Sequence, residues 1–198
     1  MVVQLVCLDA FIEHQMLEFL ESLTSSTQVI VSFLAMQEKI DLPYTDLSYA
    51  RNMAINTHAG PSWVAEVCTE RLQALNGGTF VGVSSVAGDR GRPGNYLYGA
   101  AKAAHTAYLS GLRSRLYSHR GSDRPVNVLT VNPGVIRTPA TEQLAFPDKL
   151  LGNPKTVARD IANGIATGRN VIYTPWPWYF VMKIINLIPE PIFKRLNF

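Results

Sequence analysis

Cysteine is scarce in this sequence, glycine is missing before Gly60, and long apolar runs are absent. Two cysteines among 198 residues, Cys7 and Cys68, cannot staple a fold of this size or build a zinc site, so they indicate a reducing compartment. No apolar run reaches the roughly 18–20 residues that a membrane-spanning helix needs. The opening MVVQLVCLDAF lacks the features of a secretory signal. We therefore expect a cytoplasmic protein, and the spacing of its histidines predicts no metal site.

The composition predicts one folded domain with an uneven distribution of charge. Hydrophobic residues make up 47% of the chain, which is enough to bury a core and is not typical of disordered or low-complexity proteins. Residues 1–80 carry three basic and nine acidic side chains (net −6), whereas residues 81–198 carry fifteen basic and six acidic ones (net +9). A basic half can bind phosphate, an anionic membrane surface or nucleic acid. Because the basic residues are scattered over the chain, we expect no nucleic acid partner.

Short apolar runs alternate with helical patterns along the chain. The runs predict strands at 2–8, 28–35, 79–84, 126–131 and 170–174, and the patterns predict helices near 12–23, 46–75, 98–118 and 154–167. This alternation predicts an α/β fold, a doubly wound parallel sheet covered by helices on both faces. We expect one domain over residues 1–175 and an amphipathic tail over residues 176–198.

A tyrosine and a lysine stand at helical spacing in YGAAK, as Tyr98 and Lys102. Positions i and i+4 share a helix face, and a nearby ammonium lowers the pKa of a phenol, so this tyrosine could act as an acid or base near neutral pH. Alone, such a pair is most often a solvated helix face. Two neighbours change that interpretation: Ser85 follows a predicted strand thirteen residues before Tyr98, and the strand VNVLTV leads directly into NPGVIRT. Ligands bind at such strand ends in open α/β sheets.

These motifs, in this order and spacing, resemble the short-chain dehydrogenase/reductase family over essentially the whole chain. The resemblance implies a Rossmann-like fold and hydride transfer between NAD or NADP and a carbonyl or hydroxyl group of a small-molecule substrate. It implies that Ser85 stabilises charge on the substrate oxygen, that Tyr98 donates or removes the proton, and that Lys102 holds the nicotinamide ribose and lowers the Tyr98 pKa. It further implies a homo-oligomer in which the Tyr98 helix forms an interface.

Five further residues match family positions. Asn56 matches a helix asparagine that steadies a proton-relay water, although a solvated or capping amide explains it too. Pro133, Gly134 and Thr138 match the loop around the nicotinamide. Asp9 matches an aspartate that reaches the adenine, and an N-cap of the following helix is the alternative.

Two long runs resemble one branch of the family, the reductases similar to decaprenylphosphoryl-2-keto-erythropentose reductase. The runs are SSVAGDRGRPGNYLYGAAKAAHTAYLSGLRSRL and VIYTPWPWYFVMKIINLIPEPIFKRLNF, and SFLAM at 32–36 also matches that branch. Pro93-Gly94 departs from the polar pair that is usual there. The resemblance implies a keto-sugar on a polyprenyl phosphate as substrate.

The family's phosphate-binding turn has no counterpart in this sequence. That turn is rich in glycine and follows the first strand of the fold, because the phosphate must approach the backbone closely. The resemblance aligns residues 2–8 with the family's third strand, so two βα units, roughly 50 residues, are expected to be absent. A shortened gene model, an alternative start or a degenerate paralogue would each produce this. We expect weak or absent NAD(P) binding, with residues 2–8 either beside residues 28–35 or exposed as an apolar edge.

Two alternatives remain open at this stage. A degenerate dehydrogenase fold could serve as a non-catalytic binding or interaction subunit. The segment Trp178–Ile188 is too short to span a bilayer, so it either lies in a membrane interface, at the inner face of the membrane or against a polyprenyl tail, or packs as a C-terminal helix on its own core.

Overall fold

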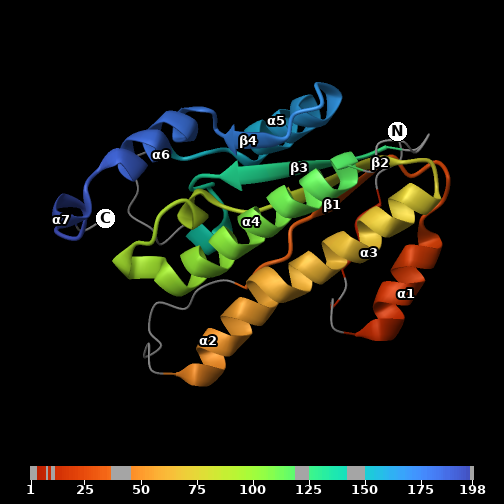
Figure 1. The fold of residues 1–198 in the computed structure, drawn as a ribbon, viewed down its shortest axis with the longest axis horizontal. Coiled ribbons are helices and arrows are strands. Elements are labelled where there is room, and N and C mark those ends of the chain that lie inside the picture. The colour runs from red at the N-terminus through yellow and green to blue at the C-terminus, as the bar shows by residue number, and fades with distance from the viewer. Residues whose placement is uncertain are drawn as a thin grey trace.

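The computed structural model describes residues 4–7, 9, 12–36, 46–118, 125–141 and 150–196. Its described strands form one parallel sheet in the order β1-β2-β3-β4 (Figure 1). The strands are β1 (Val29–Ser32), β2 (Gly78–Val83), β3 (Val126–Pro133) and β4 (Val171–Thr174). Helices connect each strand to the next, which confirms the expected α/β fold with a parallel sheet.

The helices lie close to the predicted positions. They are α1 (Glu13–Ser22), α2 (Leu47–Ala54), α3 (Gly60–Ala74), α4 (Tyr96–Ser118), α5 (Pro154–Ala166), α6 (Pro177–Leu187) and α7 (Glu190–Phe193). The predicted helix at 46–75 is α2 and α3 joined by a π-helical turn, Ile55–Ala59. Its start is fixed by Asp46, whose carboxylate accepts the backbone N–H groups of Ser48 and Tyr49.

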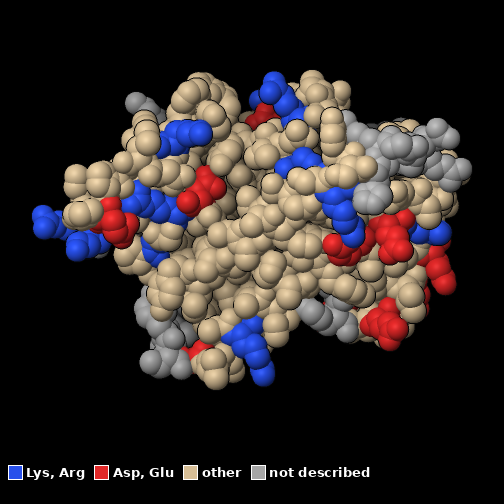
Figure 2. Space-filling view, viewed as in Figure 1, with Lys and Arg blue, Asp and Glu red and all other residues tan. Residues whose placement is uncertain are grey.

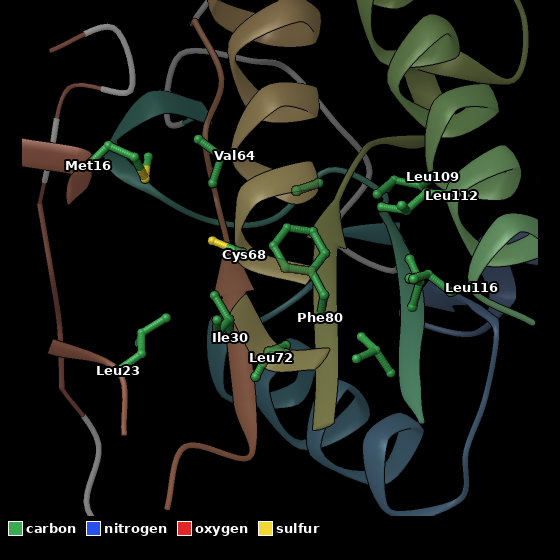
Figure 3. Packing of buried hydrophobic residues seen from close by; sticks show 13 residues of the cluster. Met16, Leu23, Ile30, Val64, Cys68, Leu72, Phe80, Leu109, Leu112 and Leu116 are labelled. Carbon is green, nitrogen blue, oxygen red and sulfur yellow. The ribbon is translucent and has the colours of Figure 1, made fainter. Parts of the chain in front are cut away.

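One face of the sheet packs against α3 and α4 through the larger hydrophobic core. Phe80 of β2 lies fully buried at its centre, between the two helices (Figure 3). Val126 and Val128 contribute to this face from β3, and Ile30 contributes from β1. Because side chains alternate along a strand, the residues between them point to the opposite face.

That opposite face packs against α5. Val81, Leu129 and Val131 form a second core with Val157 and Ile161 of α5. The alternation along β2 and β3 thus supplies both cores and makes these strands buried on both sides.

The predicted strand at residues 2–8 is wrong where the structure describes it. Gln4–Cys7 belong to no strand, and the Leu5 side chain is 96% exposed. Within the described residues β1 is bonded only to β2, so its other edge gives Gln4–Cys7 no ladder. A β-branched run forms a strand only where a neighbouring strand supplies hydrogen bonds, so propensity alone does not decide its structure. Residues 2, 3 and 8 lie outside the described residues.

The C-terminal segment packs on the domain by one side of α6. Trp178 and Met182 are buried against Val86, and the Trp178 indole N–H donates to the Leu150 carbonyl at 3.1 Å. In the part of the chain that the structure describes, no helix has the length and apolar character needed to cross a bilayer. The packing matches the expectation of a C-terminal helix on its own core, for one face of α6.

Candidate active site

Two adjacent serines follow β2 and point to different partners. Ser84 is buried, its N–H donates to the Val131 carbonyl at 2.8 Å, and its hydroxyl donates to the Lys102 carbonyl at 3.1 Å. Ser85 is half-buried, and its hydroxyl oxygen accepts the Ala87 N–H at 3.1 Å. Ser84 therefore fastens β2 to α4, whereas Ser85 keeps its hydroxyl proton available for an oxygen atom placed beside it.

Two glycines bring the loop after Ser85 onto the first turns of α4. A Cβ atom at Gly88 would lie 2.8 Å from the Ala103 nitrogen, and one at Gly99 would lie 2.8 Å from the Ala87 carbonyl oxygen. The backbones can approach this closely only because neither residue has a side chain. The approach places the segment that follows Ser85 against the helix that carries Tyr98 and Lys102.

Lys102 is a buried cation at the end of β2. The residue is 2% exposed, and its ammonium donates to the Val83 carbonyl at 2.9 Å. The same nitrogen lies 5.8 Å from the centre of the Tyr98 ring, so the predicted i, i+4 pair does share one face of α4. Burial lowers the pKa of Lys102 to about 8, because removal from water disfavours the charged form.

Tyr98 is half-buried at the start of α4, where it packs against Tyr49 and Met53 of α2 and Ala101 of its own helix. These contacts hold one side of the ring, and the Lys102 ammonium lies near it. The structure therefore gathers Ser85, Tyr98 and Lys102 at the carboxyl end of β2. That edge of a parallel sheet is where open α/β folds bind their ligands.

Asn56 lies in the π-helical turn between α2 and α3. Its side-chain amide donates to the Asn52 carbonyl at 2.9 Å, and the residue is exposed. It caps no helix, which removes that alternative interpretation. Its neighbour Thr57 is buried, and the Thr57 hydroxyl accepts the Met36 N–H at 3.0 Å, joining the segment after β1 to the turn. Single π-helical turns occur frequently at functional sites.

Pro133, Gly134 and Thr138 lie at the end of β3, the strand next to β2. The Gly134 N–H donates to the Thr174 carbonyl at 3.0 Å, and a Cβ atom on Gly134 would lie 2.0 Å from the Trp178 indole nitrogen. The C-terminal segment is thus built against this loop. Thr138 is half-buried, and its N–H donates to the Thr141 hydroxyl at 3.0 Å.

Asp9 lies in the short described stretch before α1. The residue is exposed, its N–H donates to the Gln15 side chain at 2.8 Å, and its carbonyl accepts the Ile12 N–H. The residue that caps α1 is Ile12, so Asp9 is not its N-cap. No described contact joins Asp9 to Ser85, Tyr98 or Lys102, and its adenine role stays a prediction.

Sequence reasoning missed Arg90, which joins the active-site loop to the C-terminal segment. Its guanidinium donates to the carbonyls of Ile185 and Ile188 at the end of α6, pairs with Glu190 at 3.0 Å, and lies 3.7 Å above the Phe193 ring. These partners lie about a hundred residues away in the chain, so no local pattern could have indicated them.

Two buried polar groups were also missed. Tyr173 of β4 donates its hydroxyl to the Asp89 carboxylate at 2.9 Å, and burial raises the pKa of Asp89 above its ordinary value. His105 was expected at the helix surface or an interface, but it is buried, and burial followed by the nearby charge of Lys102 lowers its pKa to about 3. The spacing of His105 after Lys102, three residues, was the available signal that both side chains point inward.

The donors at this strand end suit the nicotinamide and ribose end of a dinucleotide. A hydroxyl, a phenol and a buried ammonium are present at Ser85, Tyr98 and Lys102, and an ammonium is a suitable donor to sugar hydroxyls. The Pro133–Gly134 backbone borders the same strand end.

The family model of the short chain dehydrogenases matches residues 31–148, more than half of the chain. The chain belongs to the short-chain dehydrogenase family. A protein of Streptomyces coelicolor named as an uncharacterized oxidoreductase is 31% identical over 74% of this chain and 56% of its own length. A second uncharacterized oxidoreductase, from Mycobacterium tuberculosis, is 33% identical over 63% of this chain and 48% of its own length. The chain therefore spans about half the length of these curated relatives.

Solved short-chain dehydrogenases share the fold. One from Burkholderia cenocepacia, in complex with NADP, superimposes with a TM-score of 0.79 at 18% identity, covering 96% of this chain and 76% of its own. A bulky-bulky ketone specific alcohol dehydrogenase from Comamonas testosteroni gives 0.69 at 17% identity, covering 93% and 74%. A 3-oxoacyl-[acyl-carrier protein] reductase from Brucella melitensis, in complex with NAD, gives 0.67 at 21% identity, covering 81% and 70%.

Proposed function

We propose that the protein is an NAD(P)-dependent oxidoreductase that interconverts a carbonyl group and an alcohol. The observation that carries the proposal is the position of the Lys102 ammonium, hydrogen-bonded at the end of β2 and beside the Tyr98 ring. Family membership supports it, as do the names of solved neighbours, which include a ketone-specific dehydrogenase and a 3-oxoacyl reductase. When bound, the nicotinamide supplies or accepts the hydride.

The chain's own residues handle the substrate oxygen and its proton. The Ser85 hydroxyl donates a hydrogen bond to the carbonyl oxygen and stabilises the negative charge that develops there, since its own oxygen already accepts from Ala87. The Tyr98 hydroxyl gives that oxygen a proton during reduction and removes it during oxidation. Lys102, buried and charged below pH 8, stabilises the phenolate form of Tyr98 and binds the ribose.

Within this proposal, the substrate is a keto-sugar carried on a polyprenyl phosphate. The supporting observations are the two long runs that resemble reductases of such sugars, around Tyr98 and at the C-terminus. The experiment compares turnover of a polyprenyl-linked keto-sugar with turnover of the same keto-sugar phosphate without its lipid. Preference for the lipid-linked form supports this substrate, and equal rates remove the lipid from it.

Replacing Tyr98 with Phe tests the chemistry directly. We expect carbonyl reduction at saturating cofactor to fall roughly 10²- to 10⁴-fold, the usual effect of losing an acid–base group, while cofactor affinity changes little. Tyr117→Phe, on the exposed end of the same helix, is the matched control and should retain full activity. Wild-type rates in Tyr98→Phe would show that another group carries the proton. Absence of turnover in the wild type with cofactor bound would favour the non-catalytic alternative.

A further inference from the structure

The α6 helix is apolar on two opposite faces, and only one of them is covered. Its inner face, formed by Trp178, Val181, Met182 and Ile185, packs on the domain. The outer face carries residues spaced i, i+4, i+8 and i+11, which share one side of a helix. These residues, together with one on α7, form the outer stripe: Trp176, Phe180, Ile184, Leu187 and Ile192, with Leu187 80% exposed and Ile184 65% exposed.

Basic side chains accompany the outer stripe. Lys183 lies on the exposed side of α6 with its ammonium 5.6 Å from the Tyr179 ring, and Lys194 and Arg195 are exposed directly after α7. Figure 2 shows Lys and Arg gathered at the end of the molecule where Figure 1 places α7. The acidic group in this segment, Glu190, is paired with Arg90. The segment therefore offers exposed apolar side chains together with unopposed positive charge.

The outer stripe is held in place before any partner binds. Arg90 fixes the carbonyls of Ile185 and Ile188, and the Trp178 indole is anchored on Leu150. Because α6 is already folded and packed, covering its outer face costs no helix formation. A preorganised surface of this kind loses less entropy on binding than a disordered tail would.

We propose that the outer stripe docks on an anionic lipid bilayer. The described helix α6 is too short to cross a bilayer, but an apolar face with basic residues beside it is the pattern of a helix lying in the membrane interface. Long lysine and arginine side chains can keep their charges at the phosphate level while the apolar residues enter below them. A second copy of the chain fits less well, because an isologous contact would bring Lys183, Lys194 and Arg195 against the same charges.

Vesicle flotation with the full 198-residue chain tests this proposal. We expect binding to vesicles containing phosphatidylglycerol, weak binding to pure phosphatidylcholine, and loss of binding as salt is raised. Phe180→Ser combined with Ile184→Ser should lower the fraction bound at least tenfold. Lys194→Ser combined with Arg195→Ser should lower it on anionic vesicles by roughly fivefold per charge. Leu47→Ser, at an exposed leucine of α2, is the control and should bind as the wild type does.

Fluorescence locates the contact independently of activity. In a Trp63→Phe background, quenching by brominated lipid should reach Trp176 on the outer stripe and spare the buried Trp178. Absence of binding to anionic vesicles would overturn the proposal. A stable dimer in sedimentation that protects Trp176 and is lost in the Phe180→Ser, Ile184→Ser variant would also overturn it, by assigning the stripe to a second copy.

Discussion

Val31 and Val81 are the same residue at the same register on adjacent strands, yet their surroundings differ. They are partners across β1 and β2, and both point to the α5 side of the sheet. Val81 is 0% exposed beneath α5, whereas Val31 is 37% exposed. The sheet is therefore covered on both faces at β2 and β3 but on one face at β1, within the described residues.

The difference between these regions corresponds to the division of the site. Ser85 and Lys102 are fixed around the end of β2, and Pro133 and Gly134 end β3, so the catalytic side is built on the doubly covered strands. β1 contributes packing for the α3 face and an edge whose second side has no described strand beside it. The residues described thus support the nicotinamide end of a dinucleotide site, and the region beside β1 supplies no glycine-rich turn.

The largest stability effect should come from Lys102. Folding buries its ammonium, so its pKa falls from 10.5 to about 8 and the unfolded chain binds more protons between these values. The free energy of unfolding of the wild type should therefore rise by about 3 kcal/mol from pH 8 to pH 10.5, since one pKa unit corresponds to about 1.4 kcal/mol. Lys102→Met should remove this dependence and stabilise the protein at pH 7 while abolishing turnover.

Urea unfolding across this pH range measures the Lys102 effect. The lost hydrogen bond to Val83 costs about 1 kcal/mol, so the net gain of Lys102→Met at pH 7 should be about 2 kcal/mol. Lys155→Met, on the exposed first turn of α5, is the control and should leave the pH dependence unchanged. Parallel pH dependences in the wild type and Lys102→Met would contradict a buried, charged lysine.

The valine pair measures the coverage of the two regions. Val81→Ala should cost about 2 kcal/mol, because it opens a cavity under α5. Val31→Ala should cost less than about 0.5 kcal/mol beyond the strand propensity that both variants lose. Chemical denaturation of the two variants gives this difference. Equal losses would mean that the α5-side face of β1 is covered in solution.

The smallest effect should distinguish the two ends of the active-site loop. Gly88→Ala forces a Cβ against the α4 backbone beside Lys102 and should cost about 1 kcal/mol or more, and it should slow turnover by moving Ser85. Gly91→Ala meets no atom within 4 Å and should leave both stability and rate unchanged. Thermal unfolding and steady-state kinetics of the pair test this. Identical behaviour of the two variants would show that the loop does not pack on α4 as described.

The sequence predicted the elements whose local pattern and tertiary neighbours agree. The strand predicted at 79–84 is β2 (Gly78–Val83), and the helix predicted at 98–118 is α4 (Tyr96–Ser118), because apolar periodicity and burial coincide in both. The segment Gln4–Cys7 has strand propensity but no partner strand among the described residues, so its prediction failed.

The site was predictable only where residues close in sequence carry it. The spacing of Tyr98 and Lys102 correctly predicted a shared helix face. The hydrogen bonds of Arg90 to the end of α6 depend on how two distant segments pack, and the π-helical turn at Asn56 has no composition signal. Ser84 and Ser85 are identical in type, and only the hydrogen bonds of Ser84 to α4 separate the structural serine from the accessible one.

Comparing the affinities of NADPH and reduced nicotinamide mononucleotide for the 198-residue chain tests the central claim most directly. Pyrophosphate binding needs a glycine-rich turn at a helix N-terminus, and the first glycine here, Gly60, lies within the helical run from α2 to α3. Without several charge-assisted hydrogen bonds, binding should weaken by at least about two orders of magnitude. Calorimetry should therefore give millimolar dissociation constants for both ligands, with Lys102→Met weakening both. Micromolar NADPH with millimolar mononucleotide would show that these residues also bind the adenine half, which would contradict the account.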